Sequence, residues 1–239
     1  MMIPENAMVL AAGLGLRMRP ITDRIPKPLV RIAERTLLDR ALDHLEVVGV
    51  ARAVVNAHYR AEQIVEHLKE RTRPEIEISL EDELLETGGG VAKALSKLGE
   101  SFYVVNSDIM WLDGKVPALI RLARAWDPGR MDALLLMQRT ASAVGYEGIG
   151  DYVLDPLGLP RRRKEREVAP FLFAGVQILN RRLFEGAPAG RFSLNALYDK
   201  AQKAKRLHAI VHDGEWYHVG TPEALGVTER LLALGRIDF

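Results

Sequence analysis

The stretch VLAAGLGLRMRPITDRIPKPL, Val9–Leu29, joins an apolar run to a glycine-spaced turn and a group of cationic side chains. The apolar run predicts a buried strand over residues 7–12 that ends in the turn. The cations that follow are Arg17, Arg19, Arg24 and Lys27. Because the whole chain has a formal net charge of only +1, this positive charge is local and indicates a bound anion.

Bulk composition indicates a globular protein with one sizeable core. The chain has 239 residues, of which 48% are hydrophobic and 27% charged. It has no cysteine, which excludes disulfides and thiolate metal or nucleophile sites. The amino terminus lacks a basic n-region, and no segment approaches the roughly 18 apolar residues of a membrane span. We therefore expect a cytoplasmic protein with no membrane partner.

Alternation of short apolar runs with amphipathic segments predicts an α/β fold. Strands are expected at 7–12, 51–57, 75–80, 101–106 and 131–138, and helices at 36–49, 60–72, 89–98, 116–126, 194–204 and 222–234. This order is typical of a Rossmann-like three-layer sandwich with a mostly parallel mixed sheet. After residue 140, the segments GYEGIGDYVLDPLG and FLFAGVQIL predict shorter, partly antiparallel strands, which form a small annex in the second half.

The glycine turn matches neither common phosphate-binding loop. A P-loop requires G-x-x-x-x-G-K-[ST], which is absent. A dinucleotide fingerprint requires a third glycine where this chain has Met18. Gly13 and Gly15 are then either simple turn residues or part of a different anion cradle.

Neighbouring residues favour the anion cradle. Ala11, Ala12 and Gly13 are small, so a flat ligand can approach their backbone amides. Arg17 offers a planar fork suited to bidentate phosphate contact. Lys27 lies between two prolines, which favour an extended, stiff backbone and aim its ammonium group.

The pattern LAAGLGLRMRPIT…PKPL resembles the signature of the sugar-1-phosphate nucleotidyltransferases. Those enzymes join a nucleoside triphosphate to a sugar 1-phosphate and release pyrophosphate. The resemblance implies a single domain over 1–239, acting as a monomer or homodimer, with a nucleotide-binding half at about 1–110 and a sugar-binding half at about 111–239. It implies that the nucleotide is held by Leu10, Ala11, Ala12, Gly13, Gly15, Arg17 and Lys27.

The segment SLEDELLETGGGVAKAL, Ser79–Leu95, corresponds to the family's base-recognition segment. By this resemblance Glu81, Thr87 and Gly88 line the nucleotide pocket. The glycines would open a helix whose amides face the ligand. The alternative is an ordinary helix entry preceded by solvated acids.

The segment YVVNSDIMW, Tyr103–Trp111, resembles the family's metal-binding strand end. By this resemblance Asp108 binds Mg²⁺, with Mn²⁺ as an alternative, and Asn106 contacts the sugar. A carboxylate beside a phosphate cradle is a suitable ligand for a hard cation. The alternative is an aspartate that caps a turn.

The closing motif GEWYHVGTPEAL departs from the family pattern at His218, where the family has a second metal-binding aspartate. Three consequences remain open: Asp108, phosphates and water hold the metal alone, His218 becomes a ligand and changes the metal preference, or catalysis is impaired. Asp213 is a conceivable substitute. A further alternative is a histidine bound only to backbone.

The sugar side is less defined. The resemblance places Gly150 and Gly175 where family members let the sugar approach the backbone. The run LPRRRKEREVAP, Leu159–Pro170, is either a solvated loop or the source of an arginine that meets a carboxylate such as a lactyl group. Nucleic-acid binding through this run is disfavoured, because a glutamate interrupts it and no aromatic residues are interspersed.

Within the family, the segments LETGGG and LAAGLGLRMRPIT and the short chain most resemble a bacterial branch that serves peptidoglycan recycling and cell-wall metabolism. That branch transfers uridylyl from UTP to N-acetylmuramic acid 1-phosphate. Guanylyl transfer to mannose 1-phosphate, and a catalytically silent nucleotide-sugar-binding homologue, are the alternatives.

Charge repulsion predicts which residues catalyse. Each pair of unit charges about 4 Å apart repels by about 4 kcal/mol at an effective dielectric near 20, so the site must supply cations before two anionic substrates can meet. We expect Arg17 and Lys27 to hold the triphosphate and Asp108 to place Mg²⁺ for in-line attack on the α-phosphorus. Arg19 either assists at the rim or forms a surface ion pair.

Overall fold

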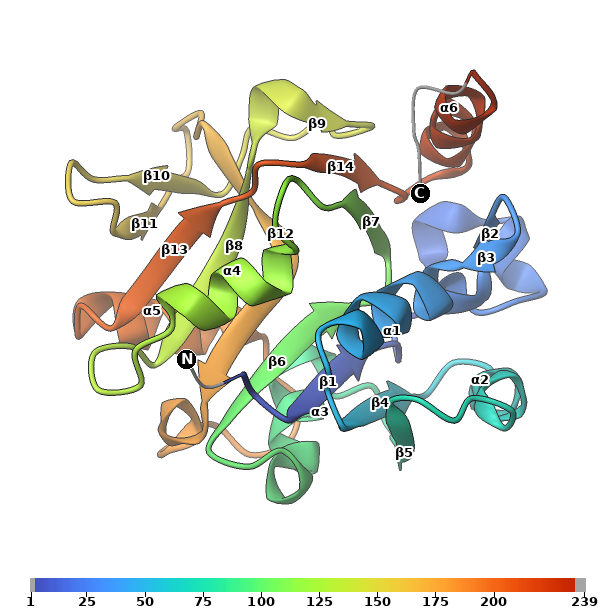
Figure 1. The fold of residues 1–239 in the computed structure, drawn as a ribbon, viewed down its shortest axis with the longest axis horizontal. Helices are drawn as coiled ribbons and strands as arrows, with labels where there is room; N and C mark the ends of the chain where they lie inside the picture. Colours follow the sequence, from blue (N-terminus) through green and yellow to red (C-terminus); the bar gives the residue numbers. More distant parts are fainter. Residues whose placement is uncertain (1–2, 235–239) are drawn as a thin grey trace.

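The computed structural model describes residues 3–234 and shows a central sheet with helices on both faces (Figure 1). The strands are β1 (Asn6–Leu10), β2 (Arg31–Ile32), β3 (Arg35–Thr36), β4 (Arg52–Ala57), β5 (Glu75–Leu80), β6 (Ser101–Asn106), β7 (Ile109–Leu112), β8 (Ala133–Arg139), β9 (Ala143–Val144), β10 (Tyr152–Leu154), β11 (Pro160–Arg162), β12 (Phe171–Asn180), β13 (Leu207–Val211) and β14 (Glu215–His218). The helices are α1 (Leu37–Val47), α2 (Ala61–Leu68), α3 (Glu86–Ala94), α4 (Ala118–Ala125), α5 (Leu194–Lys203) and α6 (Pro222–Ala233).

The main sheet has nine strands and mixed direction. Seven of them follow the order β11-β10-β12-β6-β1-β4-β5, β8 adds beside β12, and β13 pairs with β8. The pairs β6–β1, β1–β4, β4–β5 and β13–β8 are parallel, whereas β12 is antiparallel to both β6 and β8. The predicted α/β sandwich, with an antiparallel β10–β11 annex in the second half, is confirmed.

Two apolar cores, one on each face of the sheet, define the three layers. Successive side chains of β1 alternate, so that Val9 joins the core under α1, α2 and α4 while Met8 joins the core under α3 and α5. Leu42 of α1 and Leu197 of α5 are typical of the two helical faces, and both are buried. A fully buried side chain of this size stabilises the fold by about 1.5–3 kcal/mol.

A second, three-stranded sheet was not predicted as such. In it β14 lies between β7 and β9, antiparallel to β7 and parallel to β9. A third small core, which includes Met18, Met110 and Tyr217, lies beneath it. The strands are only two to four residues long, so they carry too little periodicity to be recognised in the sequence.

Two other expectations differ from the structure. Residues 145–151, expected to open an antiparallel strand, form turns and bends, and the strand begins only at Tyr152. The expected short strand FLFAGVQIL is the ten-residue β12, whose pairing with β8 shifts between Phe173 and Gln177. Gly175 lies inside that bulge with φ +79°, a conformation that glycine adopts at no steric cost.

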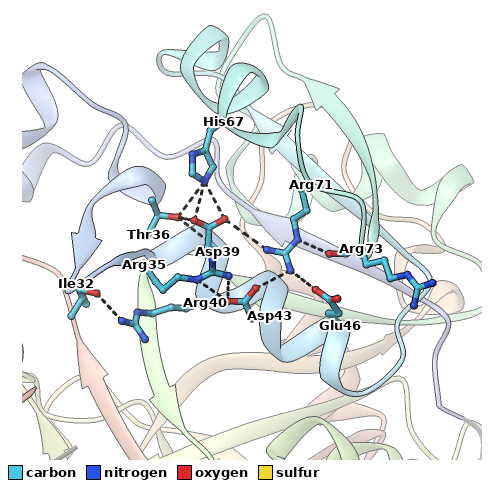
Figure 2. Close-up of polar contacts among 10 residues, drawn as sticks. All are labelled: Ile32, Arg35, Thr36, Asp39, Arg40, Asp43, Glu46, His67, Arg71 and Arg73. Atoms are coloured by element: carbon cyan, nitrogen blue, oxygen red, sulfur yellow. Dashed lines mark hydrogen bonds and ion pairs between the residues drawn. The ribbon is translucent and has the colours of Figure 1, made fainter. Parts of the chain in front are cut away.

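A group of ion pairs joins α1 to the segment after α2 (Figure 2). The guanidinium of Arg71 lies 2.9 Å from an oxygen of Asp43, 3.0 Å from Glu46 and 3.7 Å from Asp39. Asp39 also contacts Nε2 of His67 at 3.0 Å. Because the Arg71 side chain is only 11% exposed, this network is better shielded from solvent than an ordinary surface pair.

No helix within residues 3–234 is both long enough and apolar enough to cross a membrane.

Candidate active site

A cavity of about 550 Å³ lies at the carboxyl ends of β1, β4 and β6. Parallel α/β sheets bind ligands at this edge, where the loops after neighbouring strands meet. Ten of the residues predicted for the site line the cavity: Leu10, Ala11, Ala12, Gly13, Gly15, Arg17, Lys27, Thr87, Asn106 and Asp108. Glu81, Gly88, Gly150, Gly175 and His218 are not part of its wall.

The glycine turn is held in shape from two sides. The backbone amide of Ala11 donates a hydrogen bond to Oδ1 of Asn56 at 2.7 Å. Gly15 has φ +64°, and a Cβ there would lie 2.9 Å from the Thr22 side chain, whose hydroxyl donates to the Gly15 carbonyl. Only glycine therefore fits this position of the loop.

Glu81 lies behind the cavity wall rather than in it. Its side chain is buried, and its carboxylate accepts hydrogen bonds from Nδ2 of Asn56 at 2.6 Å and from the backbone amide of Leu85 at 3.1 Å. Glu81 thus orients Asn56, and Asn56 in turn orients Ala11 of the glycine turn. Glu81 therefore acts on the cavity indirectly, through the residues that it orients.

The three consecutive glycines near the start of α3 are required by close packing within the protein and not by contact with a ligand. The amides of Gly88 and Gly89 both donate to the carbonyl of Phe192, at 2.9 and 3.1 Å. A Cβ on Gly88 would lie 2.3 Å from the Phe192 ring, and one on Gly90 would lie 2.8 Å from Asn56 and Glu81. The expectation that these amides face the ligand is wrong for Gly88 and Gly89, because a protein carbonyl occupies them.

Thr87 lies in the cavity wall and also contacts the start of α5. It lines the cavity, and its hydroxyl accepts a hydrogen bond from the amide of Leu194 at 3.0 Å. That amide is at the start of α5, so Thr87 joins the two helices at the cavity wall.

Lys27 and Asp108 form an ion pair at the cavity. The Nζ–Oδ2 distance is 3.0 Å, the lysine side chain is 9% exposed and the aspartate side chain is 41% exposed. Burial raises the pKa of Asp108, but the charge and hydrogen bond of Lys27, with smaller contributions from His218 and Arg17, hold it below its usual value. Asp108 is therefore ionised and already faces a cation before any substrate binds.

The backbone at Lys27 differs from the expected extended segment. Pro26 is extended, but Lys27 begins a single 3-10 turn over Lys27–Leu29, closed by the amides of Leu29 and Val30. Pro28 is compatible with this turn, because its missing N–H is at a position where no donor is needed. The stiffness inferred from the two prolines still applies, since the lysine is almost fully buried up to its ammonium group.

His218 lies next to the ion pair without lining the cavity. It is the last residue of β14 and pairs with Ile109, the residue that follows Asp108. Its ring stacks on Trp216, with centroids 5.9 Å apart, and meets Tyr146 edge-on at 6.2 Å. Its Nε2 would lie 2.1 Å from a Cβ on Gly220, which does line the cavity.

The imidazole of His218 is held neutral. Burial lowers its pKa, and the positive charges of Lys27 and Arg17 lower it further, against an opposing contribution from Asp108. Asp213 does not replace the missing family aspartate at the site, because its carboxylate pairs with Arg121 at 2.7 Å. Arg19 also has a partner elsewhere, Asp23 at 3.1 Å, so it forms a surface ion pair.

The two glycines expected near the sugar have different neighbours. A Cβ on Gly175 would lie 3.2 Å from Cβ of Asn106, so Gly175 supports Asn106 from behind. The amide of Gly150 donates to the hydroxyl of Tyr146 at 3.1 Å. Gly150 has φ +76° and leaves no room for a side chain, since a Cβ would lie 2.1 Å from the Ala169 carbonyl.

Several cavity residues were not predicted from the sequence. Asn56, Ser107 and Ser193 line the cavity, and Tyr146 contacts His218 beside it. Asn56 had a recognisable signal, because it is a polar residue near the carboxyl end of a buried parallel strand. Ser193 had none, because it approaches the site from the start of α5.

The donors present suit a divalent cation held mainly by its substrate. Within residues 3–234, no three His, Asp or Glu side chains gather in a set that could hold a metal. Asp108 contributes one carboxylate at the cavity, and Mg²⁺ commonly binds one or two carboxylates together with phosphate oxygens and water. The residues therefore fit a shared Mg²⁺ site and do not fit a closed protein cage.

Comparison with known proteins defines the class of this enzyme. The family model described as Nucleotidyl transferase matches residues 6–149, more than half of the chain. The chain belongs to the nucleotidyl transferase family, as its amino-terminal motif predicted. It is accordingly an enzyme of the nucleotidyltransferase class.

Particular relatives are more informative still. The chain is 41% identical to N-acetylmuramate alpha-1-phosphate uridylyltransferase of Caulobacter vibrioides, covering 96% of this chain and 98% of the relative. It is 33% identical to the protein of the same name from Neisseria meningitidis serogroup B, covering 90% and 93%. The fold is similar to a UDP-glucose pyrophosphorylase crystallised with UDP-glucose, with a TM-score of 0.82 at 16% identity over 98% of this chain and all of that one.

Proposed function

We propose that this enzyme transfers a uridylyl group from UTP to N-acetylmuramic acid 1-phosphate and releases pyrophosphate. The similarity to two relatives that carry that activity in their names supports the choice of substrates. The observation that carries the chemistry is the Lys27–Asp108 ion pair at a cavity also lined by Arg17 and by the glycine turn. This arrangement presents cations, exposed backbone and the Asp108 carboxylate to the same small volume.

The reaction needs charge neutralisation and alignment more than it needs a nucleophilic side chain. Arg17 and Lys27 bind the triphosphate, and the backbone of residues 11–15 lets it approach closely. The phosphate oxygen of the sugar 1-phosphate attacks the α-phosphorus, a new P–O bond forms, and the bond to the β-phosphate oxygen breaks. Pyrophosphate leaves with that electron pair, opposite the attacking oxygen, and no covalent enzyme adduct forms.

Asp108 would hold a divalent cation together with phosphate oxygens. When bound, Mg²⁺ stabilises negative charge on the phosphate oxygens and on the departing pyrophosphate. Lys27 already contacts Asp108, so we infer that the lysine turns from the carboxylate toward phosphate as substrate binds. The neutral imidazole of His218 then adjoins the metal-binding carboxylate without adding charge. Mn²⁺ is the alternative metal, since imidazole nitrogen suits softer cations.

Pyrophosphate release tests the proposal directly. The purified protein is assayed with UTP, GTP, CTP, ATP or dTTP against N-acetylmuramic acid, N-acetylglucosamine or mannose 1-phosphates, each with Mg²⁺ or Mn²⁺. We expect the highest kcat/KM for UTP with N-acetylmuramic acid 1-phosphate. Preference for GTP with mannose 1-phosphate would replace the proposed substrates. Binding of a nucleotide-sugar without turnover under any of these conditions would instead indicate a silent homologue.

A further inference from the structure

The arginine run over residues 161–166 is not a uniform solvated patch. Arg161 pairs with Glu167 at 2.7 Å, and Arg162 pairs with Asp199 at 2.8 Å. Both of these guanidinium groups are therefore neutralised by carboxylates of the same molecule.

Arg163 is bound differently. Its guanidinium donates to the carbonyls of Gly150 at 2.9 Å, Lys164 at 3.0 Å and Glu165 at 2.7 Å. No carboxylate lies within ion-pair distance of it in the part of the chain that the structure describes. Carbonyls orient a guanidinium but leave its full charge in place, so Arg163 is a positioned cation without a counter-charge.

Arg163 lines a second, polar cavity of about 410 Å³. Asn195 and Tyr152 line it as well, and the buried hydroxyl of Tyr152 has no hydrogen-bond partner among the described residues. The carboxylate residues Asp151 and Glu165 also belong to its wall, and one carboxylate oxygen of Asp151 accepts a hydrogen bond from the amide of Phe173 at 3.0 Å. Because Arg163 pairs with neither of these carboxylates, its charge is available to an anionic group that enters this polar cavity.

The start of α5 contributes a residue to each of the two cavities. At the start of α5, Ser193 lines the active-site cavity and Asn195 lines the second one. A contact path also runs from Arg163 to the carbonyl of Gly150, from the Gly150 amide to Tyr146, and from the Tyr146 ring to His218. A sugar whose 1-phosphate is near Asp108 would thus have this cavity within reach of its far substituents.

We propose that Arg163 selects the sugar by binding a carboxylate on it, namely the carboxylate of the lactyl ether. This inference rests on the proposed function, since it assigns one end of the proposed sugar to the second cavity. The guanidinium keeps its bonds to backbone carbonyls on one side and donates to the carboxylate with its remaining N–H groups. Asn195 adds a neutral donor beside it.

N-acetylglucosamine 1-phosphate is the matched probe, because it differs from N-acetylmuramic acid 1-phosphate only by lacking the lactyl ether. In the unmodified enzyme we expect kcat/KM with UTP to be about tenfold to a hundredfold higher for the lactyl sugar, as one charge-assisted pair allows. Arg163→Gln should bring the two values within about threefold of each other, mainly by raising KM for the lactyl sugar. Arg163→Lys should recover part of the difference.

Two further variants separate recognition from structure. Arg161→Gln removes a neighbouring cation that is already paired with Glu167, and it should leave the preference unchanged. Asn195→Asp adds a negative charge to the cavity at an exposed position, and it should lower kcat/KM for the lactyl sugar alone. The second variant keeps the test decisive even if Arg163→Gln loosens the loop and fails to fold.

The possible outcomes are distinct. If neither sugar is turned over with UTP by the unmodified enzyme, the proposed function fails and the subsite with it. If the lactyl sugar is used but Arg163→Gln and Asn195→Asp affect both sugars equally, the subsite alone is refuted and Arg163 only shapes the loop. A selective loss with the lactyl sugar supports the subsite.

Discussion

Replacement of Lys27 by methionine is the most direct perturbation of the proposed chemistry. Methionine keeps an unbranched side chain to fill the space beside Gly15 and removes only the ammonium charge. Because the lysine side chain is 9% exposed, water does not easily take over the position of the ammonium group. We therefore expect a large effect on the chemical step with little effect on folding.

The magnitude follows from the geometry of the ion pair. Nζ of Lys27 lies 3.0 Å from Asp108 and can approach a phosphate oxygen similarly. At about 4 Å and an effective dielectric near 20, one unit charge is stabilised by about 4 kcal/mol. If between half and all of a unit charge develops during transfer, the barrier rises by about 2–4 kcal/mol. That corresponds to a fall in kcat of about 30-fold to 1,000-fold.

Steady-state kinetics with UTP, N-acetylmuramic acid 1-phosphate and Mg²⁺ measures this effect, and calorimetry with UTP measures binding separately. The matched control is Arg19→Met, which removes a cation from the same segment. Arg19 is 59% exposed and pairs with Asp23 on the surface, so kcat should change less than about twofold. An unchanged kcat with a raised KM in Lys27→Met would show that the lysine only binds substrate, and it would refute this account of catalysis.

The pH dependence of the same variant gives an independent check. Lys27 holds the pKa of Asp108 below its usual value, so Asp108 stays ionised as the pH falls. Without Lys27, the pKa of Asp108 should rise, and the acidic limb of the kcat/KM profile should move to higher pH. A limb that does not move would show that the ion pair does not govern the ionisation of Asp108.

Three further predictions concern stability. Arg71→Met should destabilise the fold by about 2–3 kcal/mol in urea denaturation, because three carboxylates lose their shared cation (Figure 2). The control, Lys69→Met, breaks only an exposed ion pair and should cost less than about 0.5 kcal/mol. Burial raises the pKa of Asp39, but hydrogen bonds from Thr36 and His67 lower it below its usual value. The ionised Asp39 therefore stabilises the folded state above about pH 4, and this contribution is lost as the pH falls further. Asp39→Asn should flatten the acid limb of a plot of unfolding free energy against pH. Gly88→Ala should cost about 1–3 kcal/mol, seen as a lower denaturation midpoint, since its methyl group would overlap the Phe192 ring, and a neutral result would show that the start of α3 yields.

Local sequence patterns were enough to predict the parallel strands around β1 and the cation-bearing loop. The strands at 75–80 and 101–106 have the expected bounds. Residues 101–106 are an apolar run that ends in a polar residue, whereas residues 75–80 alternate polar and apolar side chains at the edge of the sheet. The glycine turn, Arg17, Lys27 and Asp108 line one cavity, because loops that follow neighbouring parallel strands must meet at the same edge. Both inferences depend on local pattern and on a general rule of topology.

The partner of each polar group, in contrast, depends on how the elements pack in three dimensions. The sequence around Glu81 and the glycines of α3 does not distinguish contact with a nucleotide from packing inside the protein. In the structure these residues pack against Asn56 and Phe192, outside the cavity wall. Likewise, the arginines of residues 161–166 are equivalent in the sequence. In the structure Glu167 pairs with Arg161 and Asp199 pairs with Arg162, whereas Arg163 has no carboxylate partner among the described residues. Hydrogen bonds and ion pairs act over about 3–4 Å between segments that are distant along the chain, so no local pattern contains them.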